Sequence, residues 1–408
     1  MHGWTRFCCG LALLLAIFVP SHSATTVNAK ADDPQLSAQI GIVAPTAEQI
    51  TSPVAPIHSL ELQSTIATMV QQAELIVRGR VTDVQSFWRA DQRLIESTTQ
   101  VQVSYTVLGH AARYVTIHTA GGFLPREGIG MVSMHAASFA RGEEVLLFLQ
   151  RQGVTWQMVD GAAGKFLIQD KEIINRDWAV AMPVDGFLAA VTRQSTDRKT
   201  VSAFATLAQQ LAPPTQPTPL PIYFATSSSM GTVHKWLTPH ASATYLINLN
   251  SSQLANSSDH DADSIGLRNA IIAAASQWSA VATADFSLRY GGETAATATG
   301  YNGANEILFM HKGIGERAAA AEVWYRTDGT IVEADIWIND DYRWDTTGTP
   351  AARAVDLQSA LLHEFGHWLI LGHTADAQSI MYPKMAAGSV KRTLQSADIA
   401  GISTIYPR

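Results

Sequence analysis

The chain has 408 residues, of which 47% are hydrophobic and 15% charged, and its formal net charge is −7. At about 150 residues per domain, this length predicts two or three domains with sizeable cores. The 35 acidic residues outnumber the 28 basic ones, so there is no electrostatic basis for binding nucleic acid or an anionic membrane surface. We therefore exclude nucleic acid from the expected partners.

The N-terminus carries a targeting pattern. An apolar run, Phe7 to Val19, follows Arg6 and precedes small residues, which predicts a signal peptide over residues 1–23 and a secreted, extracellular protein. The run is shorter than the roughly 20 residues that span a bilayer, so a retained membrane anchor is the less favoured alternative. Both cysteines, Cys8 and Cys9, lie in this segment, and the mature chain would contain none.

A leader and a β-rich domain come next. Residues 24–58 are rich in Ala, Thr, Ser and Pro without a hydrophobic period, which predicts a flexible leader. Between about 60 and 200, a short helical pattern precedes alternating or β-branched runs at 75–81, 100–107 and 145–149, with glycines between them. Short strands with glycine turns predict an all-β barrel or sandwich, and an OB-like barrel is our fold-level hypothesis.

A proline-rich spacer separates this domain from the rest of the chain. Residues 211–221 hold five of the 16 prolines, a composition that favours an extended linker. We assign residues 222–408 to a second domain. Three possible N-caps precede helical patterns in this domain. Ser264 begins an expected helix of about 264–282, Asp356 a helix from 357 onward, and Ser396 a helix of about 396–406.

Strand-like runs lie between the first two of these helices. They cover residues 286–290, 306–310, 320–326 and 331–339. Asp328-Gly329 is placed between the last two runs, where it can form a tight hairpin turn. Helices and strands thus alternate in blocks, which predicts an α+β domain.

The second of these helices carries the pattern H-E-x-x-H. His363 and His367 stand four residues apart, so both imidazoles lie on one helix face and can reach a single metal ion. Glu364 lies about 100° around the helix, where it can take a proton from a metal-bound water. His373 can reach the same ion only if the backbone turns back, and Gly372 is available for that turn.

Three imidazoles leave one position of a tetrahedral zinc open for water, as in a catalytic site. Zinc would polarise a scissile carbonyl while Glu364 transfers the proton to the leaving amine, so the expected reaction is amide hydrolysis. A chance match of the short motif is the competing interpretation. The third histidine at a matching offset makes that interpretation much weaker.

The chain resembles the matrixin family of metzincin metalloproteases through these residues and several others. Met381, in Ser379–Pro383, resembles the Met-turn under the zinc, and Asp398 matches an acidic residue that supports this turn. Residues 320–325 resemble the edge strand that pairs with extended substrate. The resemblance covers about residues 234–407 and implies a zinc endopeptidase with a mixed, twisted sheet, three helices and a peptide or protein substrate.

Three departures from the family pattern are visible. Ile370 stands where the family usually has Gly, and a β-branched residue is costly at positive φ. We therefore expect the helix to end later, towards Leu371-Gly372, or to bend differently. The family's latency device is a pro-segment cysteine, which the mature chain lacks, so latency needs another route. Ala397 stands before Asp398 where a second acidic residue is common, so a clamp for a new amino terminus is not expected.

Some roles stay open at the level of sequence. Structural calcium is a further expectation from the resemblance, with ligands that spacing does not assign, and the candidate aspartates are Asp328, Asp335, Asp340, Asp341 and Asp345. The β-rich domain shows no ligand cluster, because its histidines, among them His135, are scattered. It could be an internal inhibitor, a module that binds substrate or a surface, or a folding aid. A non-proteolytic adhesion or binding protein is the alternative function for the whole chain.

Overall fold

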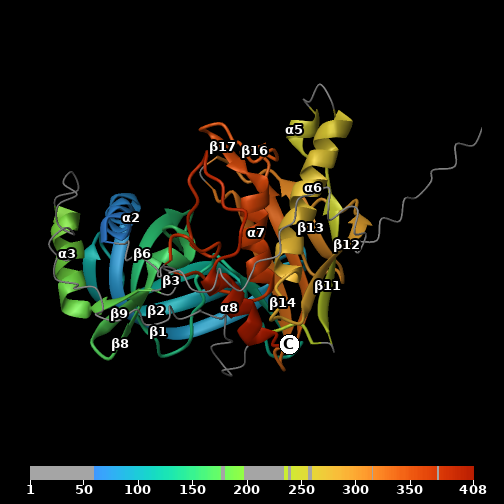
Figure 1. The fold of residues 1–408 in the computed structure, drawn as a ribbon. Helices are drawn as coiled ribbons and strands as arrows, with labels where there is room; N and C mark the ends of the chain where they lie inside the picture. The colour runs from blue at the N-terminus through green and yellow to red at the C-terminus, as the bar shows by residue number, and fades with distance from the viewer. Residues whose placement is uncertain are drawn as a thin grey trace, which may run out of the picture.

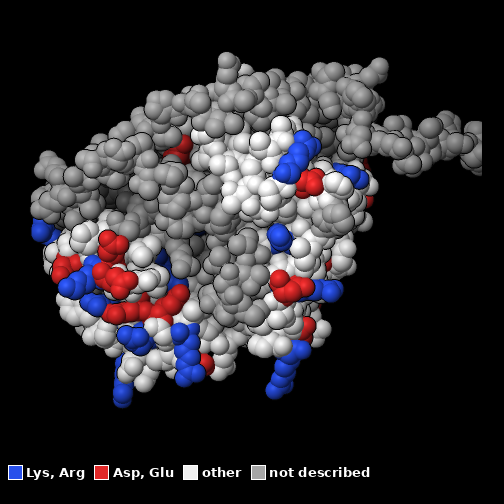
Figure 2. All heavy atoms as spheres, turned by 60° about the horizontal axis from the view of Figure 1, so that its bottom comes forward, with Lys and Arg blue, Asp and Glu red and all other residues white. Residues whose placement is uncertain are grey.

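The computed structural model describes residues 59–175, 180–196, 234–237, 240–255, 260–314, 316–374 and 376–408. The predicted signal peptide, leader and spacer lie outside these ranges. None of the helices in the described ranges is both long and apolar enough to cross a membrane. Acidic and basic side chains lie side by side on the face in Figure 2, and no large single-sign region is visible among the described residues there.

The N-terminal domain is built around one curved sheet. Its strand order is β1-β2-β3-β7-β6-β8-β9-β10, and β1 also pairs with β6, so the first five strands of this order close into a ring. Within the ring, β3 and β7 are parallel. The strands are β1 (Leu75–Trp88), β2 (Ile95–Leu108), β3 (Tyr114–Ala120), β6 (Glu144–Gln152), β7 (Thr155–Met158), β8 (Lys165–Gln169), β9 (Glu172–Asn175) and β10 (Val180–Pro183).

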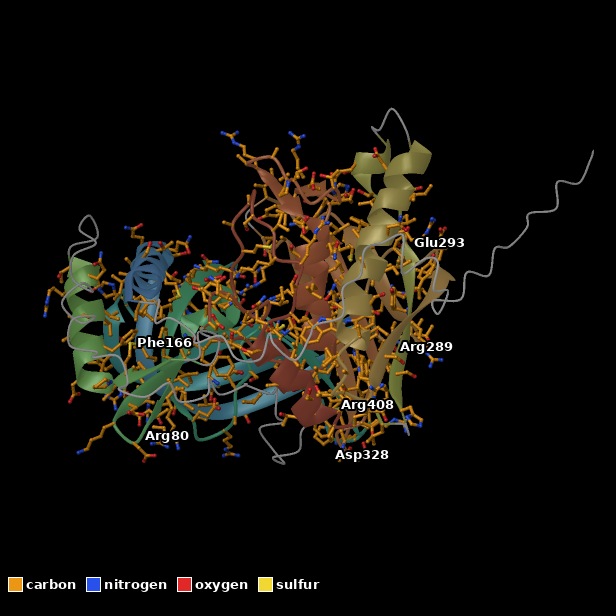
Figure 3. The ribbon with its side chains drawn as sticks, viewed as in Figure 1. Arg80, Phe166, Arg289, Glu293, Asp328 and Arg408 are labelled. Carbon is orange, nitrogen blue, oxygen red and sulfur yellow. The ribbon has the colours of Figure 1, made fainter. Side chains whose placement is uncertain are left out.

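Two helices cover the outer end of this domain, so it differs from the expected all-β domain. They are α2 (Ser59–Gln72), where the sequence shows a short helical pattern, and α3 (Val184–Thr196), which was not expected. Both present apolar side chains to a core that includes Phe166 of β8, which is labelled in Figure 3. The helices form because burying these apolar faces against the sheet removes them from water. Figure 1 places α3 at the outer edge of the N-terminal domain, with α2 beside it.

The C-terminal domain is α+β, with helices α6 and α7 packed against a mixed sheet (Figure 1). Its strands run in the order β12-β11-β13-β15-β14, and β14 alone is antiparallel to its neighbour β15. The elements are β11 (Ala241–Asn248), α5 (Ser252–Ala255), α6 (His260–Ser279), β12 (Phe286–Glu293), β13 (Asn305–Met310), β14 (Ala319–Arg326), β15 (Ile331–Asn339), β16 (Arg343–Asp345), β17 (Ala354–Asp356), α7 (Leu357–Trp368) and α8 (Ser396–Ile405).

Most of the expected elements of this domain are confirmed within a few residues. The four expected strands match β12 to β15, and the turn between β14 and β15 contains Gly329 at φ 87° and Asp328, which is labelled in Figure 3. Helix α6 begins at His260, before the expected cap Ser264. Helix α8 is capped by Gln395, one residue before Ser396. The short helix α5 was not expected.

The boundary between the two domains is crossed by a hairpin. Strands β4 (Gly122–Leu124) and β5 (Ile129–Ser133) belong to the N-terminal segment, yet β5 pairs antiparallel with β14 and so extends the C-terminal sheet. Apolar residues from both segments share one core there, including Met131 of β5 and Trp324 of β14. The edge of β14 would otherwise leave backbone N–H and C=O groups unpaired, and β5 satisfies them.

Candidate metal centre

Helix α7 positions the first two histidines. Asp356 caps it, because its carboxylate accepts a hydrogen bond from the Ser359 backbone N–H at 2.9 Å. The helix is buried between the sheet and α6, so its orientation is fixed by packing. His363 and His367 lie one turn apart, with ring centroids separated by 4.6 Å, which confirms that they share a face.

The turn after α7 differs from our expectation. The helix ends at Trp368, and Ile370 adopts φ 64°. The Ile370 N–H donates to the His367 carbonyl at 2.8 Å, and the Leu371 N–H donates to the Gly366 carbonyl at 3.1 Å. This bonding is that of a Schellman cap, with Ile370 in the left-handed position that usually belongs to Gly. The expectation of a later helix end was wrong, because cap hydrogen bonds and complete burial of Ile370 outweigh the cost of positive φ.

This turn brings His373 back to the helix. The Nε2 atoms of His373 and His363 lie 3.2 Å apart, and the ring centroids of His373 and His367 lie 5.0 Å apart. The Nδ1–H groups of the two helix histidines donate to backbone carbonyls, His363 to Ile380 at 2.7 Å and His367 to Leu371 at 2.8 Å. These bonds leave Nε2 as the ligand atom on both rings.

The three histidines fit a zinc ion. Two nitrogens of a tetrahedral zinc with bonds of about 2.0–2.1 Å stand about 3.3 Å apart, close to the 3.2 Å between His363 and His373. The Nε2 atom of His367 is buried and has no hydrogen-bond partner among the described residues, as expected of an atom that serves a metal. Burial lowers the pKa of His363 to about 4 and the pKa of His367 well below its usual range, so both rings are neutral, the form that binds metals.

Glu364 faces the same centre. Its side chain is 4% exposed, and burial raises the pKa of its carboxyl group above the ordinary value. The Oε2 atom has no hydrogen-bond partner among the described residues, so it can accept a proton from a molecule outside the chain. This placement agrees with the expected role of a general base.

The Met-turn lies beneath the helix. A Cβ atom added to Gly366, between the two helix histidines, would meet the Met381 Sδ at 2.3 Å, so only glycine allows this approach. The Asp398 carboxylate accepts hydrogen bonds from the Ile380 N–H at 3.0 Å and from the Met381 N–H at 3.2 Å. Asp398 therefore holds the Met-turn in place, as the resemblance implied.

A fourth histidine joins the centre from the N-terminal domain. His135 follows β5, and its ligand atom and those of His363, His367 and His373 all lie within 4.8 Å of one another. Its Nε2 lies 3.5 Å from Glu364 Oε1. Sequence analysis missed His135, because it stands 228 residues before the motif and no spacing connects them. No local sequence signal marks it, because the pairing of the preceding strand β5 with β14 is seen only in the structure.

Each aspartate that was a candidate calcium ligand accepts hydrogen bonds from backbone N–H groups near it. Among the described residues, the four histidines are the one group whose ligand atoms converge. The aspartate carboxylates bond to neighbouring backbone N–H groups: Asp328 to Thr330, Asp335 to Gly300 and Glu306, Asp340 to Ser252, Asp341 to Lys312 and Gly313, and Asp345 to Thr347 and Gly348. Calcium stays a prediction without assigned ligands.

Comparison with known proteins points to one family. A sequence model of the matrixin family matches residues 236–407. Metalloendoproteinase 1 of Glycine max is 34% identical over 149 residues, which cover 34% of this chain and 45% of that protein. Metalloendoproteinase 1-MMP of Arabidopsis thaliana is 40% identical over 73 residues, 18% and 19% of the two chains. Matrilysin of Homo sapiens is 34% identical over 79 residues, 19% and 28% of the two chains. The chain thus spans less than half the length of these relatives.

Proposed function

We propose that this chain, whose residues 236–407 form a domain of the matrixin family, is a zinc-dependent endopeptidase. The observation that carries the proposal is the convergence of His363, His367 and His373 beside the buried carboxylate of Glu364. The metalloendoproteinases that match this domain support the same function.

The chemistry follows from the placement of the side chains. Zinc, held by the three imidazoles, would supply a Lewis acid that polarises the scissile carbonyl and lowers the pKa of a water molecule. Glu364 takes a proton from the attacking water and delivers it to the leaving amine. The buried Met381 and the bonds to Asp398 hold the histidines in position from below, so little reorganisation is needed during the reaction.

Peptide substrates would bind along β14, which is the last strand that the C-terminal domain itself contributes to its sheet. An extended peptide that adds to this edge pairs its backbone with the strand and lies alongside α7. Specificity would then depend on β14 and on the segment after Met381. This proposal makes proteins or peptides the substrates and leaves the preferred side chains open.

Further proposals concern the remaining parts of the chain. We propose that residues 1–23 direct secretion and that the protein acts outside the cell, as the apolar run in this segment suggests. The closed ring of β1, β2, β3, β7 and β6, with β3 parallel to β7, supports an OB-like barrel for the N-terminal domain.

A non-proteolytic binding protein is the second candidate. The observation in its favour is His135, because four histidine ligands would close the zinc and make it a structural site. In that case the chain binds metal but does not cut peptides under any condition.

The test compares Glu364→Gln with the unaltered chain. A recognition sequence for a site-specific protease replaces the spacer, residues 211–221, and peptide-library cleavage is measured after the spacer is cut. We expect Glu364→Gln to lower the cleavage rate about 10²–10⁴-fold while each chain still binds one zinc. The control, Glu316→Gln, changes an exposed glutamate of the same domain and should keep full activity.

Two results would refute the protease function. One is a peptide cleavage rate of the Glu364→Gln variant that lies within a few-fold of the rate of the unaltered chain. The other is cleavage that survives removal of zinc by a chelator. Metal analysis of both chains separates a lost base from a lost zinc ion.

A further inference from the structure

The N-terminal domain contributes a fourth histidine to the group at the candidate metal centre. The His135 ring centroid lies 5.1 Å from that of His367 and 5.4 Å from that of His373, and the side chain is buried. Four histidines form a full tetrahedral ligand set, whereas a catalytic zinc keeps one position for water. A fourth imidazole in this group can take the position that water holds in a catalytic site.

We propose that His135 is the fourth zinc ligand of the intact chain and that β5 occupies the substrate edge of β14, so that the N-terminal domain holds the protease latent. This inference rests on the proposed function. It also names the route to latency that a mature chain without cysteine requires, because residues 24–408 contain none.

Strand β5 binds in the manner of an extended substrate. It pairs antiparallel with β14 from Ile129↔Arg326 to Ser133↔Glu322. The pairing continues at Met134, whose N–H donates to the Ala321 carbonyl at 3.2 Å. The next residue along this path is His135 at the metal centre. While β5 holds this edge, a peptide cannot form the same backbone hydrogen bonds.

The peptide bond that follows His135 is nevertheless not presented for cleavage. The His135 carbonyl accepts a hydrogen bond from the Ala162 N–H at 2.9 Å, so this carbonyl is engaged by the N-terminal domain and the imidazole is presented to the metal. A Cβ atom added to Gly161 would meet the His135 carbonyl at 2.3 Å, which shows how closely the loop packs. The chain therefore offers a ligand at the point where a substrate would offer a peptide bond.

The N-terminal domain also covers the second element expected to contact substrate. Tyr382, directly after Met381, is 7% exposed and packs in the apolar core that α2 and α3 form with their sheet. The Lys384 ammonium donates to Thr65 Oγ1 of α2 at 2.9 Å. Both the edge strand and the segment after the Met-turn are thus occupied by the same domain.

Further contacts fix this domain on the catalytic one. Arg317 donates to the Asp160 carbonyl at 3.2 Å and lies 3.6 Å from its carboxylate. The rings of Phe123 and Tyr325 stack with centroids 6.2 Å apart. A Cβ atom on Gly130 would meet the Tyr325 ring at 2.3 Å, so a larger residue at position 130 requires the ring or strand β5 to move.

The test uses the full chain loaded with Co²⁺, whose visible absorption reports the ligand set, and acetohydroxamate as a small chelating probe. His135→Ala should open one metal position, change the spectrum and bind acetohydroxamate at least about tenfold more tightly than the unaltered chain. The control, His110→Ala, removes an exposed histidine of the same domain and should leave both readouts unchanged.

A second variant keeps all four histidines. Gly130→Val should displace β5 from β14, and it is expected to produce the same spectral change together with a rise in peptide cleavage by the uncut chain. Circular dichroism and metal content establish that both variants are folded and loaded. An unaltered chain that binds acetohydroxamate as tightly as His135→Ala, with the same spectrum, would overturn the inference.

The outcomes separate this inference from the proposed function. If His135→Ala opens the metal position but the double variant with Gly130→Val cleaves no peptide, the coordination is correct and the protease function is refuted. If the uncut, unaltered chain cleaves peptides as fast as the chain with a cut spacer, the protease function stands and latency is refuted.

Discussion

The strained turn at Ile370 provides a direct test of how the third histidine is placed. Ile370 adopts φ 64° and is completely buried, so two effects of opposite sign act there. A β-branched residue in the left-handed region costs about 1–2 kcal/mol, whereas deletion of a buried Ile side chain costs about 2–5 kcal/mol. Ile370→Ala should therefore be clearly less stable than the natural chain.

The comparison of Ile370→Ala with Ile370→Gly isolates the contribution of backbone strain to stability. Both variants lose the buried side chain, but only Gly adopts positive φ without strain. We expect Ile370→Gly to exceed Ile370→Ala in free energy of unfolding by about 1 kcal/mol. At Ala360, inside helix α7, the order should be reversed, because Ala360→Gly costs about 1 kcal/mol in a helix interior.

The assay is urea unfolding followed by tryptophan fluorescence, with a chelator present so that zinc binding makes no contribution. If Ile370→Ala equals or exceeds Ile370→Gly in stability, position 370 does not have positive φ. The Schellman turn and its placement of His373 would then be incorrect. Zinc affinity of Ile370→Gly should stay close to that of the natural chain, since Gly adopts the same turn.

Two other predictions concern pH and dilution. Burial raises the pKa of Glu333 to about 7, so the folded chain keeps a proton that the unfolded chain loses near pH 4.3. The stabilisation, about 3–4 kcal/mol, is then complete below pH 4.3 and is lost as the pH rises through 7. Urea unfolding from pH 4 to 8 should show a falling stability, and Glu333→Gln should make this fall less steep. An unchanged slope in that variant would contradict the prediction. Cutting the spacer makes the inhibitory domain a separate chain, so cleavage activity per molecule should rise on dilution. An uncut chain whose activity shows the same dilution dependence would exclude an intramolecular inhibitor.

Local sequence patterns predicted much of the catalytic domain. The Asp356 cap predicted the start of helix α7, and the turn at Asp328-Gly329 predicted the hairpin of β14 and β15. These features depend on residues within a few positions of one another, where backbone geometry alone relates spacing to direction. The same local rule placed His363 and His367 on one face.

Local rules failed where packing outweighs intrinsic preference. At Ile370, conformational preference predicted a later helix end, but burial and two cap hydrogen bonds hold the residue at positive φ. At α3, apolar residues such as Phe187 form a helix against a β core, which the glycine-punctuated pattern of the surrounding strands did not indicate.

The sequence by itself predicted the H-E-x-x-H motif, the proposed base and the Met-turn, because each depends on short spacing along the chain. Only the tertiary structure decided that β5 leaves its own domain to pair with β14 and that His135 meets the other three histidines. Contacts between residues more than 180 positions apart depend on how two separately packed cores meet, and no period or spacing within either segment encodes that meeting.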